Sequence, residues 1–370
     1  MKNSARSLNF LSQLLLGDSK NADSKNASDS AANAAAVKNI SSASNLSSDD
    51  FGDLWNLANS HHVIMRTFPA LRAMMEAQGS DKLGWIDRAL AKERARIDHA
   101  VSFLAPICDS LEEAGDVVVI KSLDHWPDLG NDLDLYTNAN AADVVSIMKE
   151  RFKADLDDRS WGDKLANKWN FVVPGLPELV EVHVGRLGQT GEQIAITRSL
   201  TSRAGTVEYS GQTFRVPAAE DRMVISTLQR MYRHFYVRLC DVVDNAKLME
   251  SGLVDYAYLK SLAKSAGLWD GLATYLVIVS EYVESYRGRG VDLPPLVTEA
   301  ARFGNELVYF KRNFLRIPIF PQSAKLYASE WTRLLLNGEF ANTLRLSLLP
   351  GLATAAALEM KFTGSDKGIW

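Results

Sequence analysis

Residues 117–136, VVVIKSLDHWPDLGNDLDLY, constrain the fold more than any other stretch of the chain. They open with three valines and an isoleucine, and such a β-branched run predicts a buried strand. Pro127 and Gly130 then interrupt regular structure, and residues 132–136 alternate polar and apolar side chains. Because alternate side chains of a strand point to the same face, Asp132 and Asp134 are predicted to project together from a second strand.

Two carboxylates side by side on one strand repel each other unless a cation lies between them. Mg²⁺ prefers oxygen ligands, so the Asp132–Asp134 pair favours a magnesium site, with Mn²⁺ as the alternative ion. A solvated strand end is the other interpretation, because Asp is common at the ends of strands. An EF-hand loop does not fit, because its Gly and its closing Glu are absent at the required spacing.

The order of strand, small-residue turn and the run GNDLD at 130–134 resembles the polymerase-β-like nucleotidyltransferase superfamily. More narrowly, Lys121-Ser122 and the WPD run at 126–128 resemble bacterial families described as uncharacterised nucleotidyltransferases. The resemblance implies Mg²⁺-dependent transfer of a nucleoside monophosphate from an NTP to a hydroxyl acceptor. It makes Asp132 and Asp134 catalytic metal ligands and places Lys121 and Ser122 at the nucleotide. Ser122 stands where these families usually have Gly, and its side chain narrows the room for a triphosphate.

A β-hairpin is predicted at 169–187, with its turn at the PGLP run 174–177. In its second strand, valines alternate with Glu181 and His183, so these two polar residues share a face. The superfamily has a third carboxylate on a strand beside the Asp-x-Asp strand. The resemblance therefore makes Glu181 the third catalytic metal ligand and His183 a candidate catalytic group. The alternatives are an exposed strand charge for Glu181 and a hydrogen-bonded structural histidine for His183.

Residues 220–249 predict a continuous helical segment on which Arg230, His234 and Arg238 recur every four residues and share one face. One interpretation of this face is a binding site for a nucleotide polyphosphate or for the acceptor, with His234 and Arg238 as nucleotide-binding residues. The other is a solvated surface on which Arg238 pairs with Asp241. The pattern also resembles the helix that follows the catalytic core in the same bacterial families, which favours the phosphate role.

The remaining sequence surrounds this core with helices. Residues 17–50 are almost entirely Ser, Asn, Ala, Asp and Lys, which cannot bury enough apolar surface to fold. Residues 53–78 and 81–114 have helical periodicity, with kinks or breaks expected at Pro69 and Pro106. The predicted regions are a disordered N-terminus at 1–50, helices at 51–115, the core at 116–190, a helical domain at 191–362 and a loose tail at 363–370. The predicted fold class is α/β (α+β): a small mixed-sheet core with N-terminal helices and an all-helical C-terminal domain.

Composition narrows the function classes. Lys and Arg number 41 against 45 Asp and Glu, a net charge of −4, which argues against a dedicated DNA-binding protein. No apolar run is long enough to cross a bilayer, so no membrane association is expected. Cys108 and Cys240 are predicted to be buried, inert thiols, because no neighbouring residue has metal-ligand spacing, and a cytoplasmic location fits.

Three functional hypotheses remain open. The leading one is the nucleotidyltransferase, whose partners are an NTP and an acceptor that the sequence does not identify: a small molecule, a peptide, a protein or RNA. The second is a catalytically silent relative that binds nucleotide or a partner protein, for which Ser122 is the main argument. The third is a helical interaction protein whose acidic strand is merely solvated.

Overall fold

The computed structural model describes residues 2–17 and 47–363. Its centre is a five-stranded mixed sheet with the strand order β1-β2-β5-β4-β3. The strands are β1 (Val117–Val119), β2 (Asp132–Thr137), β3 (Asp155–Leu156), β4 (Lys168–Val172) and β5 (Leu179–Val184). The β2–β5 pair is parallel, and the others are antiparallel. The predicted α/β fold class with a small mixed sheet is therefore confirmed.

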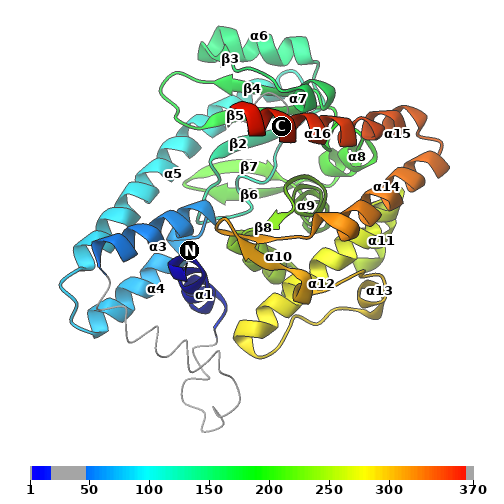
Figure 1. The fold of residues 1–370 in the computed structure, drawn as a ribbon. Helices are drawn as coiled ribbons and strands as arrows, with labels where there is room; N and C mark the ends of the chain where they lie inside the picture. Colours follow the sequence, from blue (N-terminus) through cyan, green and yellow to red (C-terminus); the bar gives the residue numbers. More distant parts are fainter. Residues whose placement is uncertain (1, 18–46, 364–370) are drawn as a thin grey trace.

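One face of this sheet packs against helices and the other carries the polar residues. Helix α5 (Leu83–Glu112) contacts β1 and β2, and it also contacts α6 (Ala141–Phe152), the helix that follows β2 (Figure 1). Leu133, Leu135, Val180 and Val182 are fully buried in the core cluster that includes α5. Burial of each such side chain stabilises the folded state by roughly 1.5–3 kcal/mol. Because these apolar residues must face α5, the acidic residues that alternate with them project from the opposite face of the sheet.

The N-terminal residues that are described do not fit the predicted disorder of residues 1–50. Residues Lys2–Leu16 form helix α1, and Ser48 already belongs to α3 (Ser48–Ser60). Leu8, Leu11 and Leu16 are buried, and α1 packs on α3, α4 (Ile64–Ala77) and α12 (Trp269–Arg287). The prediction was wrong here because a short amphipathic helix gains its stability from tertiary packing. Residues 18–46 of that region lie outside the described part of the chain.

The two prolines do not break their helices, so of the kinks or breaks expected there, the breaks do not occur. Pro69 lies inside α4 and Pro106 inside α5. The predicted 53–78 helix breaks instead between α3 and α4, where His62 has a φ of 51°. At that break the ring of His61 bridges two distant segments: Nε2 lies 2.7 Å from the Asn313 carbonyl oxygen, and Nδ1 accepts the Leu239 N–H at 2.9 Å. These tertiary bonds position the break.

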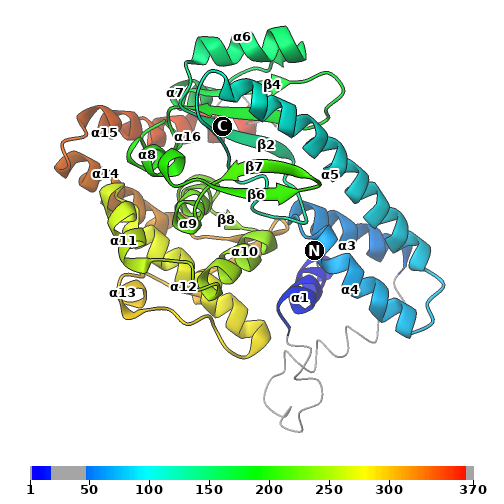
Figure 2. The same cartoon turned by 180° about the vertical axis from the view of Figure 1, so that it is seen from behind.

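The C-terminal region is mainly helical, as predicted, but it also contains two small sheets. One is the hairpin of β6 (Gly205–Tyr209) and β7 (Gln212–Val216), and Figure 2 shows it beside β2. The other is a three-stranded sheet of β8 (Tyr236–Val237), β9 (Tyr309–Lys311) and β10 (Phe314–Arg316), which departs from the predicted all-helical domain.

The other helices of the described residues include three short turns, named η. The elements are α7 (Trp161–Leu165), α8 (Ala195–Ser202), α9 (Ala219–Thr227), η3 (Leu228–His234), α10 (Leu239–Glu250), α11 (Tyr256–Ser265), α13 (Pro295–Thr298), η4 (Asn305–Leu307), η5 (Ile319–Ser323), α14 (Ala324–Leu336), α15 (Phe340–Ser347) and α16 (Leu349–Thr363). The predicted loose tail at 363–370 lies outside the described part beyond residue 363. None of the helices within residues 2–17 and 47–363 has the length and apolarity that crossing a membrane requires.

The continuous helical segment predicted over 220–249 is divided into α9, η3, β8 and α10. Phe235 adopts a left-handed conformation with a φ of 53°, which ends the helical run after His234. Arg238 is consequently the N-terminal capping residue of α10 and does not share a helix with Arg230 and His234. The expected pairing is also corrected, because the Asp241 carboxylate binds the Nε of Arg230 at 2.7 Å and only the backbone N–H of Arg238.

Candidate functional site

The predicted acidic residues meet on the open face of the sheet. In the parallel register of β2 and β5, Asp134 lies directly opposite Glu181. Ligand atoms of Asp134, Glu181 and His183 all lie within 4.8 Å of one another. Asp132 is two residues before Asp134 on the same strand and therefore projects from the same face. The structure thus brings Asp134 and Glu181 together with His183, and it places Asp132 at the more exposed edge of the group.

Two lysines compensate part of this negative charge. Lys121 forms an ion pair with the Oδ1 of Asp134. Lys168, on β4, lies 3.0 Å from the Oε1 of Glu181 and 2.9 Å from the Oδ1 of Asp163. Sequence analysis missed Lys168, which lies one residue before the predicted hairpin at 169–187. In the antiparallel register Lys168 pairs with His183, and directly opposed residues share a face of the sheet.

The environment separates the protonation behaviour of the two aspartates. Burial, together with the charges of Glu181 and Asp134, raises the pKa of Asp132 to about 6. Burial also disfavours the charged form of Asp134, but the Lys121 ammonium and His183 outweigh it and hold the pKa of that carboxyl well below its usual range. Asp132 is therefore the member of the pair that resists ionisation, while Asp134 is a carboxylate throughout the physiological range.

The donor set fits a hard divalent cation. Four carboxyl groups, those of Asp132, Asp134, Asp163 and Glu181, share two ammonium groups, so negative charge is left over. The Nε2 of the buried His183 lies 3.7 Å from the Oδ1 of Asp134, and neither ring nitrogen makes a hydrogen bond to the described residues. Burial lowers the pKa of His183. Oxygen ligands with an excess of negative charge are what Mg²⁺ and Mn²⁺ require. Asp132, Asp134 and Glu181 are the residues that could hold such an ion.

A cleft of about 160 Å³ opens over the acidic group. Lys121, Ser122 and the three predicted ligands line one side, and residues of η3 and the segment after it line the other. The lining residues of that second wall are Gln229, Arg230, Arg233, His234, Tyr236 and Arg238. The turn at Phe235 therefore delivers His234 and Arg238 to the same cleft, although they do not lie on one helix as the sequence suggested.

The two walls of the cleft carry opposite charge. Arg230 is fully buried and is neutralised by Asp241. Within residues 2–17 and 47–363, neither Arg233 nor Arg238 forms an ion pair, and the guanidinium of Arg238 donates only to the Tyr236 hydroxyl at 3.3 Å. Arg233 was not singled out by sequence reasoning, because it falls outside the four-residue spacing of Arg230, His234 and Arg238. Arg233 and Arg238 are therefore available to bind an anion such as a phosphate. A metal ion held by the carboxylates opposite could bind the same anion.

Ser122 is turned toward β2. Its hydroxyl donates to the carbonyl oxygen of Asp132 at 3.1 Å and accepts the N–H of Asp134 at 2.7 Å. The preceding residue, Lys121, has a φ of 61°, a left-handed conformation that is uncommon for a residue with a side chain. The turn and the hydroxyl together hold the Lys121 ammonium beside Asp134. The side chain of Ser122 therefore fastens the loop to the strand that carries both aspartates.

Comparison with known proteins adds little to this geometry. No family model matches the chain, and neither does any curated protein. Among solved structures, the chain is similar to the crystal structure of an antigenic nucleotidyltransferase-like protein from Paracoccidioides brasiliensis, with a TM-score of 0.33 and 13% sequence identity. The match covers 51% of this chain and 94% of that one. A similarity at this level carries no functional argument, so the role of the site is argued from its residues.

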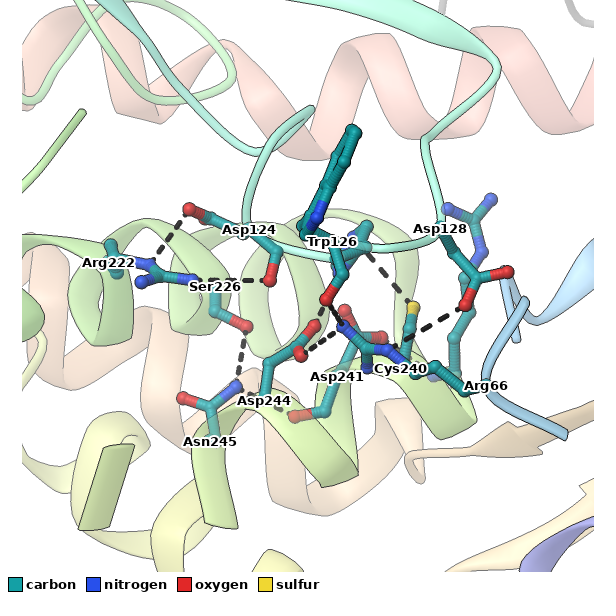
Figure 3. Close-up of polar contacts among 12 residues, drawn as sticks. Arg66, Asp124, Trp126, Asp128, Arg222, Ser226, Cys240, Asp241, Asp244 and Asn245 are labelled. Carbon is teal, nitrogen blue, oxygen red and sulfur yellow. Dashed lines mark hydrogen bonds and ion pairs between the residues drawn. The ribbon is translucent and has the colours of Figure 1, made fainter. Parts of the chain in front are cut away.

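The loop between β1 and β2 is anchored by buried ion pairs that sequence analysis did not find (Figure 3). Asp128, in the WPD run, accepts a hydrogen bond from the Met65 N–H at 2.7 Å, and its carboxylate lies 3.7 Å from the Nε of Arg66. Burial raises the pKa of Asp128 to about 7. Arg66 also donates to the Trp126 carbonyl oxygen at 3.0 Å and contacts Asp244 at 2.7 Å. Asp128 is thus a structural anchor of the loop, and the WPD run does not contribute a carboxylate to the cleft.

Proposed function

We propose that this protein is a metal-dependent nucleotidyltransferase that moves a nucleoside monophosphate from an NTP to a hydroxyl acceptor. The observation that carries the proposal is the direct opposition of Asp134 and Glu181 across the parallel strands β2 and β5, with Asp132 on the same face. Metal-dependent nucleotidyl transfer requires carboxylates that hold cations beside a polyphosphate. The arginine-lined wall across the same cleft supplies the complementary anion-binding groups.

In this proposal each wall of the cleft has its own task. Asp132, Asp134 and Glu181 hold the ion, and Arg233 and Arg238 bind the triphosphate, with His234 beside them. A bound Mg²⁺ or Mn²⁺ would neutralise phosphate charge and acidify the acceptor hydroxyl. The acceptor oxygen forms a bond to the α-phosphorus, the bond to the pyrophosphate oxygen breaks so that pyrophosphate leaves, and the hydroxyl proton passes to solvent. Charge neutralisation and positioning supply most of the rate in such reactions.

A second candidate function is nucleotide binding without turnover. The ion pairs of Lys121 with Asp134 and of Lys168 with Glu181 favour it, because they satisfy two of the three carboxylates without a metal. The third hypothesis, a merely solvated acidic strand, is not supported, because Asp134 is only 8% exposed. The two remaining functions differ in whether bound NTP is consumed.

The test combines thermal unfolding with labelling. Wild type, Asp132→Asn, Asp134→Asn and the exposed control Asp143→Asn are melted with and without NTP and Mg²⁺. Each is also incubated with α-labelled NTPs and cell extract. We expect Mg²⁺-dependent stabilisation and labelled product for wild type and the control, and neither for the two cleft variants. Stabilisation without label in any extract favours the silent binder. The absence of any shift with all four NTPs, or equal labelling by all proteins, contradicts the proposal.

The arginine wall offers a separate test. Arg233→Gln and Arg238→Gln should each weaken NTP binding about tenfold or more, because a charge-assisted hydrogen bond to phosphate is worth about 1.5–3 kcal/mol. Arg94→Gln, an exposed residue of α5, is the matched control. Binding is measured by titration calorimetry at fixed ionic strength. Unchanged affinity in both variants would remove this wall from the nucleotide site.

A further inference from the structure

A second cluster of metal-binding side chains lies where α10 meets the β1–β2 loop, and one of its members, His125, also lines the cleft. Cys240 and Asp241 come from the first turn of α10, and His125 comes from the loop, 115 residues earlier. All three are buried, and one ligand atom from each lies within 4.8 Å of the others. Figure 3 shows Cys240, Asp241 and Asp244 on the same helix, facing the loop that carries Trp126. This group takes no part in the proposed nucleotidyl transfer.

The orientation of the His125 ring is that of a metal ligand. Its Nδ1 lies 2.6 Å from the Oδ2 of Asp244, and Arg66 fixes Asp244 through a contact of 2.7 Å with its other oxygen. The Nε2 consequently points to Cys240, with 3.7 Å between Nε2 and Sγ. A carboxylate on the far nitrogen is the usual way in which a metal-binding histidine is held. For a tetrahedral zinc ion with ordinary bond lengths, sulfur and nitrogen ligands stand about 3.6 Å apart.

The third residue completes a mixed donor set. Asp241 uses Oδ2 for both its contact with Arg230 and the bond from the Arg238 N–H, so Oδ1 is the oxygen available to a metal. The Cys240 thiolate and the Asp241 carboxylate would bring two negative charges to a divalent ion, and Asp241 would share its charge between the ion and Arg230. A sulfur ligand with an imidazole selects zinc over magnesium, whose preference is for oxygen alone.

A catalytic Cys–His–Asp arrangement has similar residues but does not fit. Cys240 is 0% exposed, and it does not line the cleft, so its sulfur cannot reach a substrate. Burial also raises the pKa of its thiol, whereas a nucleophilic cysteine needs a lowered one. A metal ion requires no access for substrate, and it would retain the thiolate by direct coordination.

We propose that His125, Cys240 and Asp241 bind one Zn²⁺ ion. The ion joins α10 to the loop of residues 120–131 between β1 and β2. It therefore holds the loop that shapes the cleft, independently of what the cleft binds. Since its ligands are separated by 115 residues, this site has none of the short spacings by which zinc sites are found in a sequence.

The experiment uses the full chain, purified without chelator and reconstituted with Zn²⁺ or Co²⁺. Metal content is measured by plasma mass spectrometry, and cobalt binding by the near-ultraviolet thiolate-to-cobalt absorption band. We expect about one Zn²⁺ per chain and the cobalt band in wild type and in Cys108→Ser. Cys108 is the matched control, because it is the other buried cysteine of the chain and belongs to neither metal-binding group of the described residues.

Cys240→Ser and His125→Asn should lose the stoichiometric zinc, and Cys240→Ser should lose the cobalt band. A chelator should lower the Tm of wild type and Cys108→Ser alone. The cobalt band is measured on wild type, so the proposal stays testable if the variants fail to fold. Absence of that band, zinc far below one per chain after reconstitution, or equal zinc in folded Cys240→Ser would each overturn it. The tests of the cleft measure Mg²⁺-dependent melting and labelling, whereas the tests of the zinc site measure zinc content and the cobalt–thiolate band. A negative result for the zinc site therefore leaves the proposed function unaffected.

Discussion

The ammonium group of Lys121 forms an ion pair with the carboxylate of Asp134, and no described residue forms one with Asp132, two positions earlier on the same strand. The two aspartates of the Asp-x-Asp pair are therefore not equivalent before any metal binds. One is a compensated, buried carboxylate. The other, the carboxyl of Asp132, is partly buried and lies near the negative charges of Glu181 and Asp134. Burial and these two charges raise its pKa to about 6.

Asparagine substitutions at the two positions should shift stability in opposite directions. In metal-free buffer at pH 8, Asp132→Asn should stabilise the protein by about 2 kcal/mol, because it removes a charge that burial and its neighbours disfavour. Asp134→Asn should destabilise it by about 3 kcal/mol, because it leaves the Lys121 ammonium buried without its partner. Urea unfolding in EDTA measures both. Equal shifts of the same sign would show that Lys121 does not distinguish the two carboxyls.

Ser122→Gly should loosen the turn at the start of the loop. The substitution removes the hydroxyl that bonds the backbone of both Asp132 and Asp134, so we expect a loss of about 1–2 kcal/mol and weaker NTP binding. This differs from the expectation based on the family pattern, in which Gly makes room for phosphate. Thermal melts and NTP titrations of Ser122→Gly, Ser122→Ala and wild type decide between them. Tighter binding by Ser122→Gly would show that the side chain obstructs the nucleotide.

Leu11→Ala should destabilise the whole protein, because Leu11 is completely buried between α1 and the rest of the core. Large-to-small changes at such sites cost about 2–5 kcal/mol. Asn9→Ala, at an exposed position of the same helix, is the comparison: it removes only the acceptor of a 2.8 Å hydrogen bond from the Tyr286 hydroxyl and should cost about 1 kcal/mol. Denaturant unfolding gives both values. No difference between the two variants would mean that α1 contributes nothing to the fold.

Asp221 should make stability depend on pH. Burial raises its pKa to about 6 although the Nη1 of Arg203 lies 3.7 Å from its Oδ2, and neither side-chain oxygen has a hydrogen bond in the described structure. Because the folded pKa exceeds the unfolded value of 3.8, the folded state holds the proton more tightly, and stability falls as pH rises from about 4 through 6. Asp221→Asn should therefore stabilise the protein by about 2 kcal/mol at pH 8. The gain should fade as the pH is lowered below 6.

Glu220→Gln is the matched control for that experiment. The neighbouring Glu220 carboxylate is well satisfied, with Arg203 at 2.7 Å and the Asp255 N–H at 2.8 Å. Its neutralisation should destabilise the protein at pH 8. Stability curves of the three proteins between pH 4 and 8 provide the measurement, and a pH-independent effect of Asp221→Asn would contradict the assignment.

The sequence by itself determined the local part of the site. The alternation at 132–136 and the hairpin around 174–177 predicted which side chains share a face, so Asp132 was correctly placed on the face of Asp134, and Glu181 on the face of His183. The same alternation placed His183 beside Glu181. These predictions succeeded because a strand repeats every two residues, and that period can be read from a few neighbours.

Only the tertiary structure decided what surrounds those carboxylates. The left-handed turn at Phe235 directs Arg238 into the cleft, and no local sequence pattern predicts this turn. The pairing of Ser12 with the Tyr282 hydroxyl at 2.8 Å, across 270 residues, holds a helix whose sequence neighbourhood predicts disorder. His125 and Cys240 meet in the same way. Such contacts form because packing a common core brings distant segments together, and the free energy that selects them belongs to the whole fold and not to any short stretch.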